Sequence, residues 1–281
     1  MTDSSPERTE PERPGPPVAA PARVWPVFAA WLIAFAAIVI FSAFAAALLA
    51  SMYPDVPPAA LLRELPGLLA GATASSVALI LTLLLVNRRF APAQLRLVPG
   101  RETGRDLALM ILGTLALGQA LDSLTVLTGL GRHGALWDAR RTLAGAAGEE
   151  LFVAVLVIGP LAGTAEELFF RGFMQTRLRA RWPPRWAVAA TSACFAIMHI
   201  EWLHALLAFA LGLYLGFITE QAGSALPAVA SHVVNNMLFT LATALGGTVL
   251  AFWPNVVLLT VGVLVFAGCV VHLRRTLGTA A

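Results

Sequence analysis

The stretch at residues 159–179, GPLAGTAEELFFRGFMQTRLR, places two adjacent carboxylates, Glu166 and Glu167, at the end of an apolar run. An ionised side chain at the centre of a bilayer costs about 2.5–3.5 kcal/mol, so such acids indicate a functional site with a charge partner. Arg171 follows Glu167 by four residues and shares its helix face. Glu166 points about 100° away from that pair, which leaves it available for chemistry. The alternative is a charge cluster at the membrane edge that only orients the helix.

Composition indicates an integral membrane protein. Of the 281 residues, 58% are hydrophobic and only 12% are charged, and several apolar stretches approach the roughly 20 residues that span a bilayer. We expect an all-α fold, a polytopic membrane helix bundle with about eight transmembrane helices. The sequence places them near residues 27–50, 66–86, 107–127, 151–177, 186–200, 203–217, 225–245 and 250–271. The Gly159-Pro160 pair predicts a kink in the fourth.

Four regions follow from this pattern. Residues 1–23 are rich in proline and charge and predict a disordered cytoplasmic tail. Residues 24–130 hold the N-terminal transmembrane helices, 150–245 the polar residues of the expected catalytic core, and 246–281 the last transmembrane helix with a short cytoplasmic tail.

The basic residues predict the orientation in the membrane. All 19 are arginines, and fifteen of them fall on one side of the bundle if the N-terminus is inside. The positive-inside rule therefore places both termini in the cytoplasm. The same rule explains the basic character of the chain, so we expect the lipid bilayer and no nucleic acid as a partner. The alanine-rich, lysine-free composition looks bacterial and indicates the bacterial cell membrane.

Two histidines lie at the depth of Glu166 in the predicted bundle. At about 1.5 Å of rise per residue, Glu166, His199 and His232 each lie about 15–20 Å from the same end of their helices. Phe195 precedes His199 by four residues, so the two share a helix face. Asn236 follows His232 in the same way. A lone histidine in an apolar helix is more often a hydrogen-bonded packing residue, but two beside a carboxylate favour a catalytic site.

Other polar residues fit structural roles. Glu149 and Glu150 resemble the first acid pair, but Ala154 stands where an arginine would be needed, so we expect them at the membrane interface. Glu201 and His204, near the end of the fifth predicted helix, are also expected to be structural.

Three short motifs follow one another on successive predicted helices: EExxxR at residues 166–171, FxxxH at 195–199 and HxxxN at 232–236. In order and spacing they resemble the motifs of the CPBP intramembrane endopeptidases, also called the CAAX prenyl protease or Abi family. The resemblance covers about residues 150–245. All three motifs together are a strong signal, whereas EExxxR alone is a weak one.

The resemblance implies an intramembrane endopeptidase that hydrolyses peptide bonds of membrane-associated or prenylated, CAAX-like proteins or peptides. One acid and one histidine would activate water, and a second histidine with an amide would stabilise the oxyanion. The expected catalytic residues are, in that order, Glu166, His199, His232 and Asn236. The expected supporting residues are Glu167, Arg171 and Phe195.

The resemblance leaves the need for a metal open. The family is usually described as a metalloprotease group, and two histidines with a glutamate resemble a catalytic zinc shell. A divalent metal such as zinc would be held by Glu166, His199 and His232. The same side chains can also activate water directly.

Two functions of other classes are compatible with the sequence. A proton-coupled transporter would use Glu166 and His199 as a relay. Such carriers are often built from inverted repeats, and the sequence contains no second EExxxR half. An inactive protease-like membrane scaffold is expected to have lost a catalytic residue, and none is missing from the motifs.

Overall fold

The computed structural model describes residues 23–87, 91–132, 134–246 and 251–278, and helices are the only regular elements in this part of the chain. The expected all-α membrane bundle is confirmed. The expected disordered tail lies, apart from Arg23, outside the described residues. The four expected regions stay a prediction.

Seven helices within the described residues are long and apolar enough to cross a membrane. They are α1 (Trp25–Met52), α3 (Leu65–Val86), α4 (Gly104–Leu127), a composite span (Gly148–Arg179), α10 (Trp202–Ala222), α11 (Leu226–Gly246) and α12 (Phe252–Leu277).

The fifth expected span, at residues 186–200, corresponds to α9 (Pro184–Ile197), which has only 14 residues. At 1.5 Å per residue it extends about 21 Å, less than the roughly 30 Å of a hydrocarbon core. It packs against α10 and is not among the helices that are long and apolar enough to cross a membrane. The sequence places the start of this helix within two residues but carries its end three residues too far, to residue 200.

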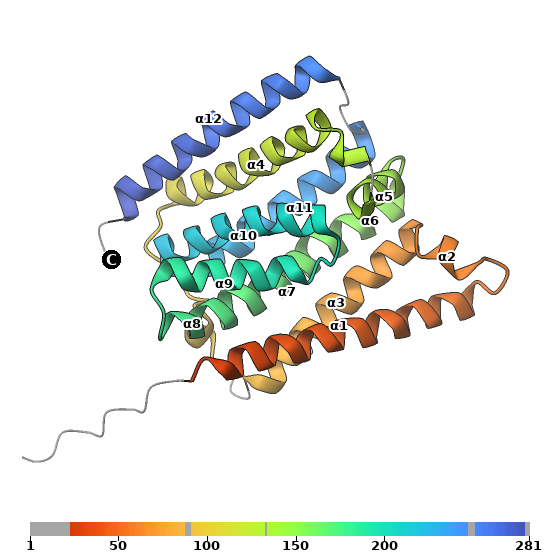
Figure 1. The fold of residues 1–281 in the computed structure, drawn as a ribbon, viewed down its shortest axis with the longest axis horizontal. Helices are drawn as coiled ribbons and strands as arrows, with labels where there is room; N and C mark the ends of the chain where they lie inside the picture. Colours follow the sequence, from red (N-terminus) through yellow and green to blue (C-terminus); the bar gives the residue numbers. More distant parts are fainter. Residues whose placement is uncertain (1–22, 88–90, 133, 247–250, 279–281) are drawn as a thin grey trace, which may run out of the picture.

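Short elements lie between the spans. They are α2 (Pro58–Leu61), α5 (Gly134–Leu143) and two 3₁₀ turns, Pro92–Leu95 and Leu130–Arg132. Helix α5 contacts α3, α10 and α11. It lies at the end of the bundle opposite α8 (Figure 1).

The spans form layers around the composite helix (Figure 1). Helices α4 and α12 pack against each other on one side, and α1 and α3 pack against each other on the opposite side. The composite span and helices α9, α10 and α11 lie between these pairs. The start of α1 and the end of α12 lie at the same end of the bundle, together with α8 (Thr176–Arg179).

The composite span departs from α-helical geometry in two segments. Helices α6 (Gly148–Leu156), α7 (Thr164–Glu167) and α8 are joined by π-helical segments at Val157–Gly163 and Leu168–Gln175. Pro160 lies in the first segment. Proline has no N–H to donate to the preceding turn, and π turns often occur at functional sites. The irregularity expected at Gly159-Pro160 is therefore a widened helix.

Two glycines of the first π segment allow α11 to approach closely. A Cβ at Gly163 would lie 3.3 Å from the backbone of Val233, and a Cβ at Gly159 would overlap the Met237 side chain. Glycine permits such contacts because it has no Cβ. The close approach brings the face of α11 that carries His232 up to α7.

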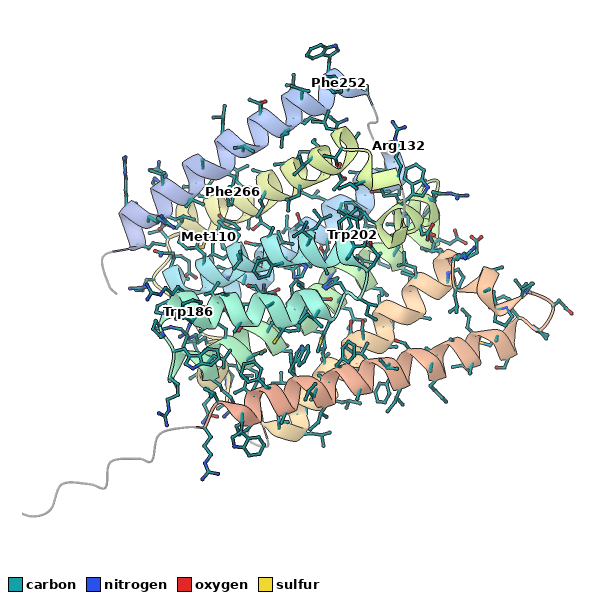
Figure 2. The ribbon with its side chains drawn as sticks, in the orientation of Figure 1. Met110, Arg132, Trp186, Trp202, Phe252 and Phe266 are labelled. Atoms are coloured by element: carbon teal, nitrogen blue, oxygen red, sulfur yellow. The ribbon has the colours of Figure 1, made fainter. Side chains whose placement is uncertain are left out.

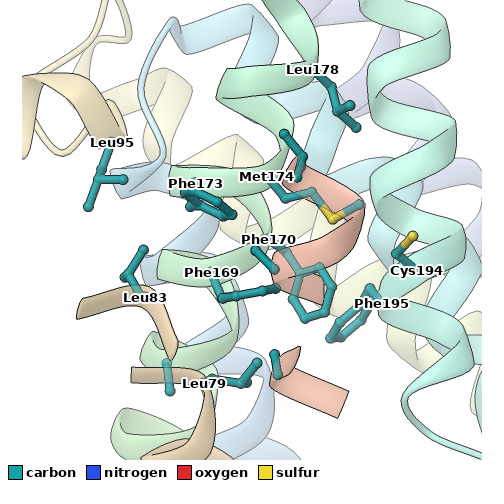
Figure 3. Close-up of a cluster of buried hydrophobic side chains, with 14 of the residues drawn as sticks. Leu79, Leu83, Leu95, Phe169, Phe170, Phe173, Met174, Leu178, Cys194 and Phe195 are labelled. Atoms are coloured by element: carbon teal, nitrogen blue, oxygen red, sulfur yellow. The ribbon is translucent and has the colours of Figure 1, made fainter. Parts of the chain in front are cut away.

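Aromatic side chains of the second π segment fill the core on the other side (Figure 3). Phe169 and Phe170 pack edge to face, with ring centroids 5.3 Å apart, and Phe170 meets Phe195 of α9 at 5.1 Å. The cluster extends to Leu79 and Leu83 of α3. Burial of these rings fixes the side of the composite span that faces α3 and α9.

Exposed tryptophans lie toward both ends of the bundle. Trp25, Trp186, Trp202 and Trp253 are all largely exposed, and Trp186 and Trp202 lie toward opposite ends in Figure 2. Tryptophan is enriched at the two membrane–water interfaces. The two ends of the bundle therefore match the two surfaces of a bilayer.

Replacement of Gly262 by leucine should destabilise the α4–α12 pair. A Cβ at Gly262 would lie 2.8 Å from the backbone oxygen of Ala116 and 3.1 Å from Cβ of Ala120. Overpacking of this kind costs about 1–3 kcal/mol. We expect Gly262→Leu to lower the thermal unfolding temperature in detergent. Gly268→Leu on the same helix is the control, because a Cβ there meets nothing within 4 Å. Equal unfolding temperatures would contradict this packing.

Candidate active site

A histidine of α11 lies between the two glutamates of α7. Nδ1 of His232 lies 2.7 Å from Oε1 of Glu167, and Nε2 lies 3.7 Å from Oε2 of Glu166. An ionised carboxylate can only accept a hydrogen bond, so Nδ1 of His232 carries a proton and donates it. The ring is thereby oriented with Nε2 toward Glu166.

Glu167 and Arg171 form a fully buried ion pair. Nη1 of Arg171 donates to Oε1 of Glu167 at 2.7 Å, and both side chains have 0% exposure. The guanidinium also donates from Nη2 to the Gly212 carbonyl at 3.1 Å and lies 4.9 Å from the ring centroid of Phe195. Buried ions persist when they are paired and hydrogen-bonded. The pair predicted from the four-residue spacing is therefore present.

Glu166, Glu167, Arg171 and His232 form a cluster that we call the acidic cluster. Glu166 is its most accessible member. Its side chain is 22% exposed, whereas Glu167 and Arg171 are inaccessible and His232 is 4% exposed. The composite helix turns the two adjacent carboxylates to different environments, as the 100° step per residue requires. Glu167 is committed to internal partners, and Glu166 can meet water or a ligand.

His199 lies in the turn between α9 and α10. Its Nδ1 lies 3.0 Å from the Phe195 carbonyl oxygen, which can only accept, so Nδ1 donates. In the neutral ring this leaves Nε2 as an acceptor. The next residue, Ile200, has φ +61°, a left-handed conformation that is strained for a β-branched side chain. The expectation that His199 lies within a membrane helix is thus wrong, because α9 ends two residues earlier.

The amide of Asn236 is partly engaged. Its Nδ2 donates to the Ile158 carbonyl oxygen at 3.0 Å, within the first π segment. The amide keeps one further N–H. The Oδ1 of Asn235 lies near α4, 2.8 Å from where a Cβ at Gly118 would be. Its Nδ2 donates to Oδ1 of Asn236 at 3.5 Å, so the two adjacent amides also contact each other.

The structure brings together most of the predicted site. Glu166, Glu167, Arg171 and His232 form one chain of contacts. Phe195 packs edge-on against His199 and His232, with centroid distances of 4.8 and 6.0 Å. Among the described residues, no ion pair within 4.0 Å joins Glu166 to His199. Direct contact of the acid is with the α11 histidine.

Two features of the site are absent from the sequence motifs. The first is the Ile158 carbonyl that Asn236 contacts. A pattern of side chains cannot predict which backbone carbonyl accepts a hydrogen bond. The second is His204, whose ring centroid lies 4.4 Å from that of His199. Glu201 has the expected structural role, because its carboxylate accepts from the backbone N–H groups of Leu203 and His204 at the start of α10.

The described side chains do not form a ready metal site. No group of three or more His, Cys, Asp or Glu side chains among them is placed to hold a metal ion. Imidazole and carboxylate are suitable zinc donors by type, but here His232 and Glu166 are the only predicted ligands in direct contact.

The fold and site define a polytopic, all-helical membrane protein with an acid–histidine centre between its candidate membrane-spanning helices. Residues 148–238 match the family described as "Rce1-like: Type II CAAX prenyl endopeptidase Rce1-like". These residues therefore form an Rce1-like type II CAAX prenyl endopeptidase (CPBP/Abi) family domain. Comparisons with curated proteins and with solved structures give no match. The matched residues include all three motifs and the whole acidic cluster.

Replacement of Arg171 by methionine should strongly destabilise the fold. The substitution leaves Glu167 buried without its charge partner, and breaking such a pair costs about 3–5 kcal/mol. We expect a large fall in the thermal unfolding temperature in detergent. Arg185→Met, at an exposed position of α9, should change the free energy of unfolding by less than about 0.5 kcal/mol.

The double variant Glu167→Gln with Arg171→Met isolates the charge pair. Residues in direct contact give non-additive effects, so the double variant should lose less stability than the two single variants combined. Strict additivity would show that the two charges do not stabilise each other.

Proposed function

We propose that this protein is an intramembrane endopeptidase that hydrolyses peptide bonds with a water molecule activated by a glutamate. The observation that carries the proposal is the partly exposed Glu166 beside the buried chain His232–Glu167–Arg171. Buried partners fix the position of the histidine, while the exposed carboxylate can reach a substrate. The family domain at residues 148–238 supports a protein or peptide as the substrate.

Glu166 is the proposed general base. In the reaction it takes one proton from a water molecule, and the resulting hydroxide forms a bond to the peptide carbonyl carbon. Nε2 of His199 is the second acceptor available to that water, because Nδ1 is occupied by the Phe195 carbonyl. A general base typically contributes a factor of about 10²–10⁴ to the rate. The proton then passes from Glu166 to the leaving amine as the peptide bond breaks.

His232 and Asn236 are the proposed oxyanion donors. The attack turns the carbonyl oxygen into an oxyanion, which is stabilised by donors that are already oriented. A protonated His232 would present Nε2–H on the Glu166 side, since Glu167 holds Nδ1. Asn236 would use its remaining N–H, since the other contacts Ile158. Both donors come from one face of α11.

A divalent metal ion such as zinc at this site is a separate proposal, because the proposed hydrolysis does not require one. Glu166, His199 and His232 match zinc by donor type but are not grouped as three ligands in the structure. A bound divalent ion would supply Lewis acidity and a more acidic water. Glu166, His199, His232 and Asn236 carry every step of the proposed hydrolysis.

The proposed substrates are membrane-associated or prenylated, CAAX-like proteins and peptides. The proposed location is the bacterial cell membrane, with both chain termini in the cytoplasm, as the arginine distribution predicts. In this orientation Glu166 lies in the cytoplasmic half of the bilayer, and water would reach it from that side.

Replacement of Glu166 by glutamine should remove peptidase activity. Glutamine keeps the size of the side chain but cannot act as a base, so we expect cleavage of a quenched peptide or prenyl-peptide library to fall by about 10²–10⁴-fold. Glu149→Gln is a matched control, because Glu149 begins the similar sequence EELF but lies exposed in the first turn of α6. Undiminished cleavage by Glu166→Gln would overturn the assignment of Glu166 as the general base.

Chelator treatment of the active protein tests the metal. Loss of cleavage that is restored by added zinc, together with zinc in the purified protein by elemental analysis, would establish a metal site. Full activity of a metal-free sample would establish direct activation of water by the side chains.

Replacement of Asn236 by alanine should lower kcat more than it changes KM. Loss of one oxyanion donor typically costs a factor of about 10²–10³ in kcat. Gln119→Ala is the control, because the Gln119 amide bonds Ser123 within α4. Equal effects of the two substitutions would contradict the oxyanion role of Asn236.

A further inference from the structure

Polar side chains continue along the composite span beyond the acidic cluster. After Glu167 and Arg171, the same four-residue spacing reaches Gln175 and Arg179. Gln175 has no exposure at all. A buried, uncharged polar side chain eight residues from the site is not explained by the proposed chemistry.

These side chains of the composite span, the polar stripe Arg171, Gln175 and Arg179, contact residues of α10 at the same four-residue spacing. The α10 residues are Gly212, Gly216 and Glu220. Nη2 of Arg171 donates to the Gly212 carbonyl at 3.1 Å, and Nε2 of Gln175 donates to the Gly216 carbonyl at 3.0 Å. Nε2 of Gln175 also donates to Oε1 of Glu220 at 2.9 Å. The two helices are therefore joined at three successive turns.

The glycines make these contacts possible. A Cβ at Gly212 would lie 3.2 Å from Nη2 of Arg171, and a Cβ at Gly216 would lie 2.9 Å from Oε1 of Gln175. Any larger residue would push the polar side chain away from the α10 backbone. The Gly212–Gly216 pair thus acts as a hydrogen-bonding surface as well as a packing surface.

Glu220 joins the stripe to the arginine-rich end of the bundle. Its Oε1 accepts from Nη1 of Arg96 at 2.8 Å as well as from Gln175, and its Oε2 accepts from Nε of Arg179 at 2.7 Å. The Glu220 side chain is only 14% exposed. One carboxylate therefore holds the composite span, α10 and the loop before α4 together.

The π-helical segment helps to keep the stripe straight. Four residues of an α-helix turn about 400°, so residues at this spacing drift by about 40° at every step. The residues Leu168–Gln175 form a π-helix, whose wider turns contain more residues and counteract that drift. This explains how three side chains at four-residue spacing all reach α10.

We propose that Gln175 and Glu220 are positioning residues that set the register of the composite span against α10. A shift of this register would separate Arg171 from the Gly212 carbonyl and disturb the Glu167–His232 hydrogen bond. His232 would then lose its fixed orientation toward Glu166. The proposal rests on the proposed function for its catalytic meaning, but the geometric effect on His232 needs no substrate.

The test measures the His232 hydrogen bond directly. In labelled protein in detergent, the Nδ1 proton of His232 should give a downfield NMR signal that is absent in His232→Gln. We expect Gln175→Met and Glu220→Gln to make this proton exchange with solvent at least about tenfold faster. Gln119→Met is the matched control, because the Gln119 amide bonds Ser123 within α4.

Unchanged exchange in both variants, with helical content retained by circular dichroism, would overturn the proposal. If Glu220→Gln does not fold, Gln175→Met decides alone, since it changes no charge. Where peptide cleavage is measurable, kcat should fall in both variants while KM stays unchanged. A protein that cleaves nothing but shows the faster exchange would refute the proposed function and leave the positioning role in place.

Discussion

The buried ion pair between Glu167 and Arg171 is the constraint on which the rest of the site depends. Two charges without solvent contact are tolerated only when they are paired and hydrogen-bonded. Here the carboxylate is shared with His232, and the guanidinium is shared with the Gly212 carbonyl and the Phe195 ring. These partners come from α9, α10 and α11. The contacts of this one ion pair therefore hold three helices against the composite span.

The composite span meets this requirement by departing from α-helical geometry. The π-helical segment around Pro160 offers the Ile158 carbonyl to Asn236, and its glycines let α11 come close. The second segment carries the aromatic residues that anchor the span in the core and the polar residues that face α10. Irregular helix geometry is common where a membrane protein must present polar groups inside the bilayer. In this protein both irregular segments flank the four residues of α7 that hold the glutamates.

Burial decides the roles of chemically identical groups. Glu166 and Glu167 are adjacent carboxylates, yet one is fully enclosed and shared between two cationic or polar partners, while the other retains access to the surroundings. His199 and His232 differ in the same way: one donates to a backbone carbonyl in a turn, and the other donates to a carboxylate within a helix bundle. The division between structural and reactive groups therefore follows from which partners each side chain has.

The sequence by itself determined the helical membrane fold, the Glu167–Arg171 pair and the different facing of Glu166. These features depend on hydropathy and on the angle between residues a few positions apart in one helix, which are local properties. Only the tertiary structure decided that α9 is too short to span the bilayer, that His199 lies in a turn, and that His232 contacts both glutamates. Only the tertiary structure also decided that Gln175 meets Glu220. Those contacts join residues 45 to 66 positions apart, and their geometry depends on how helices end, widen and pack, which no spacing within one helix specifies.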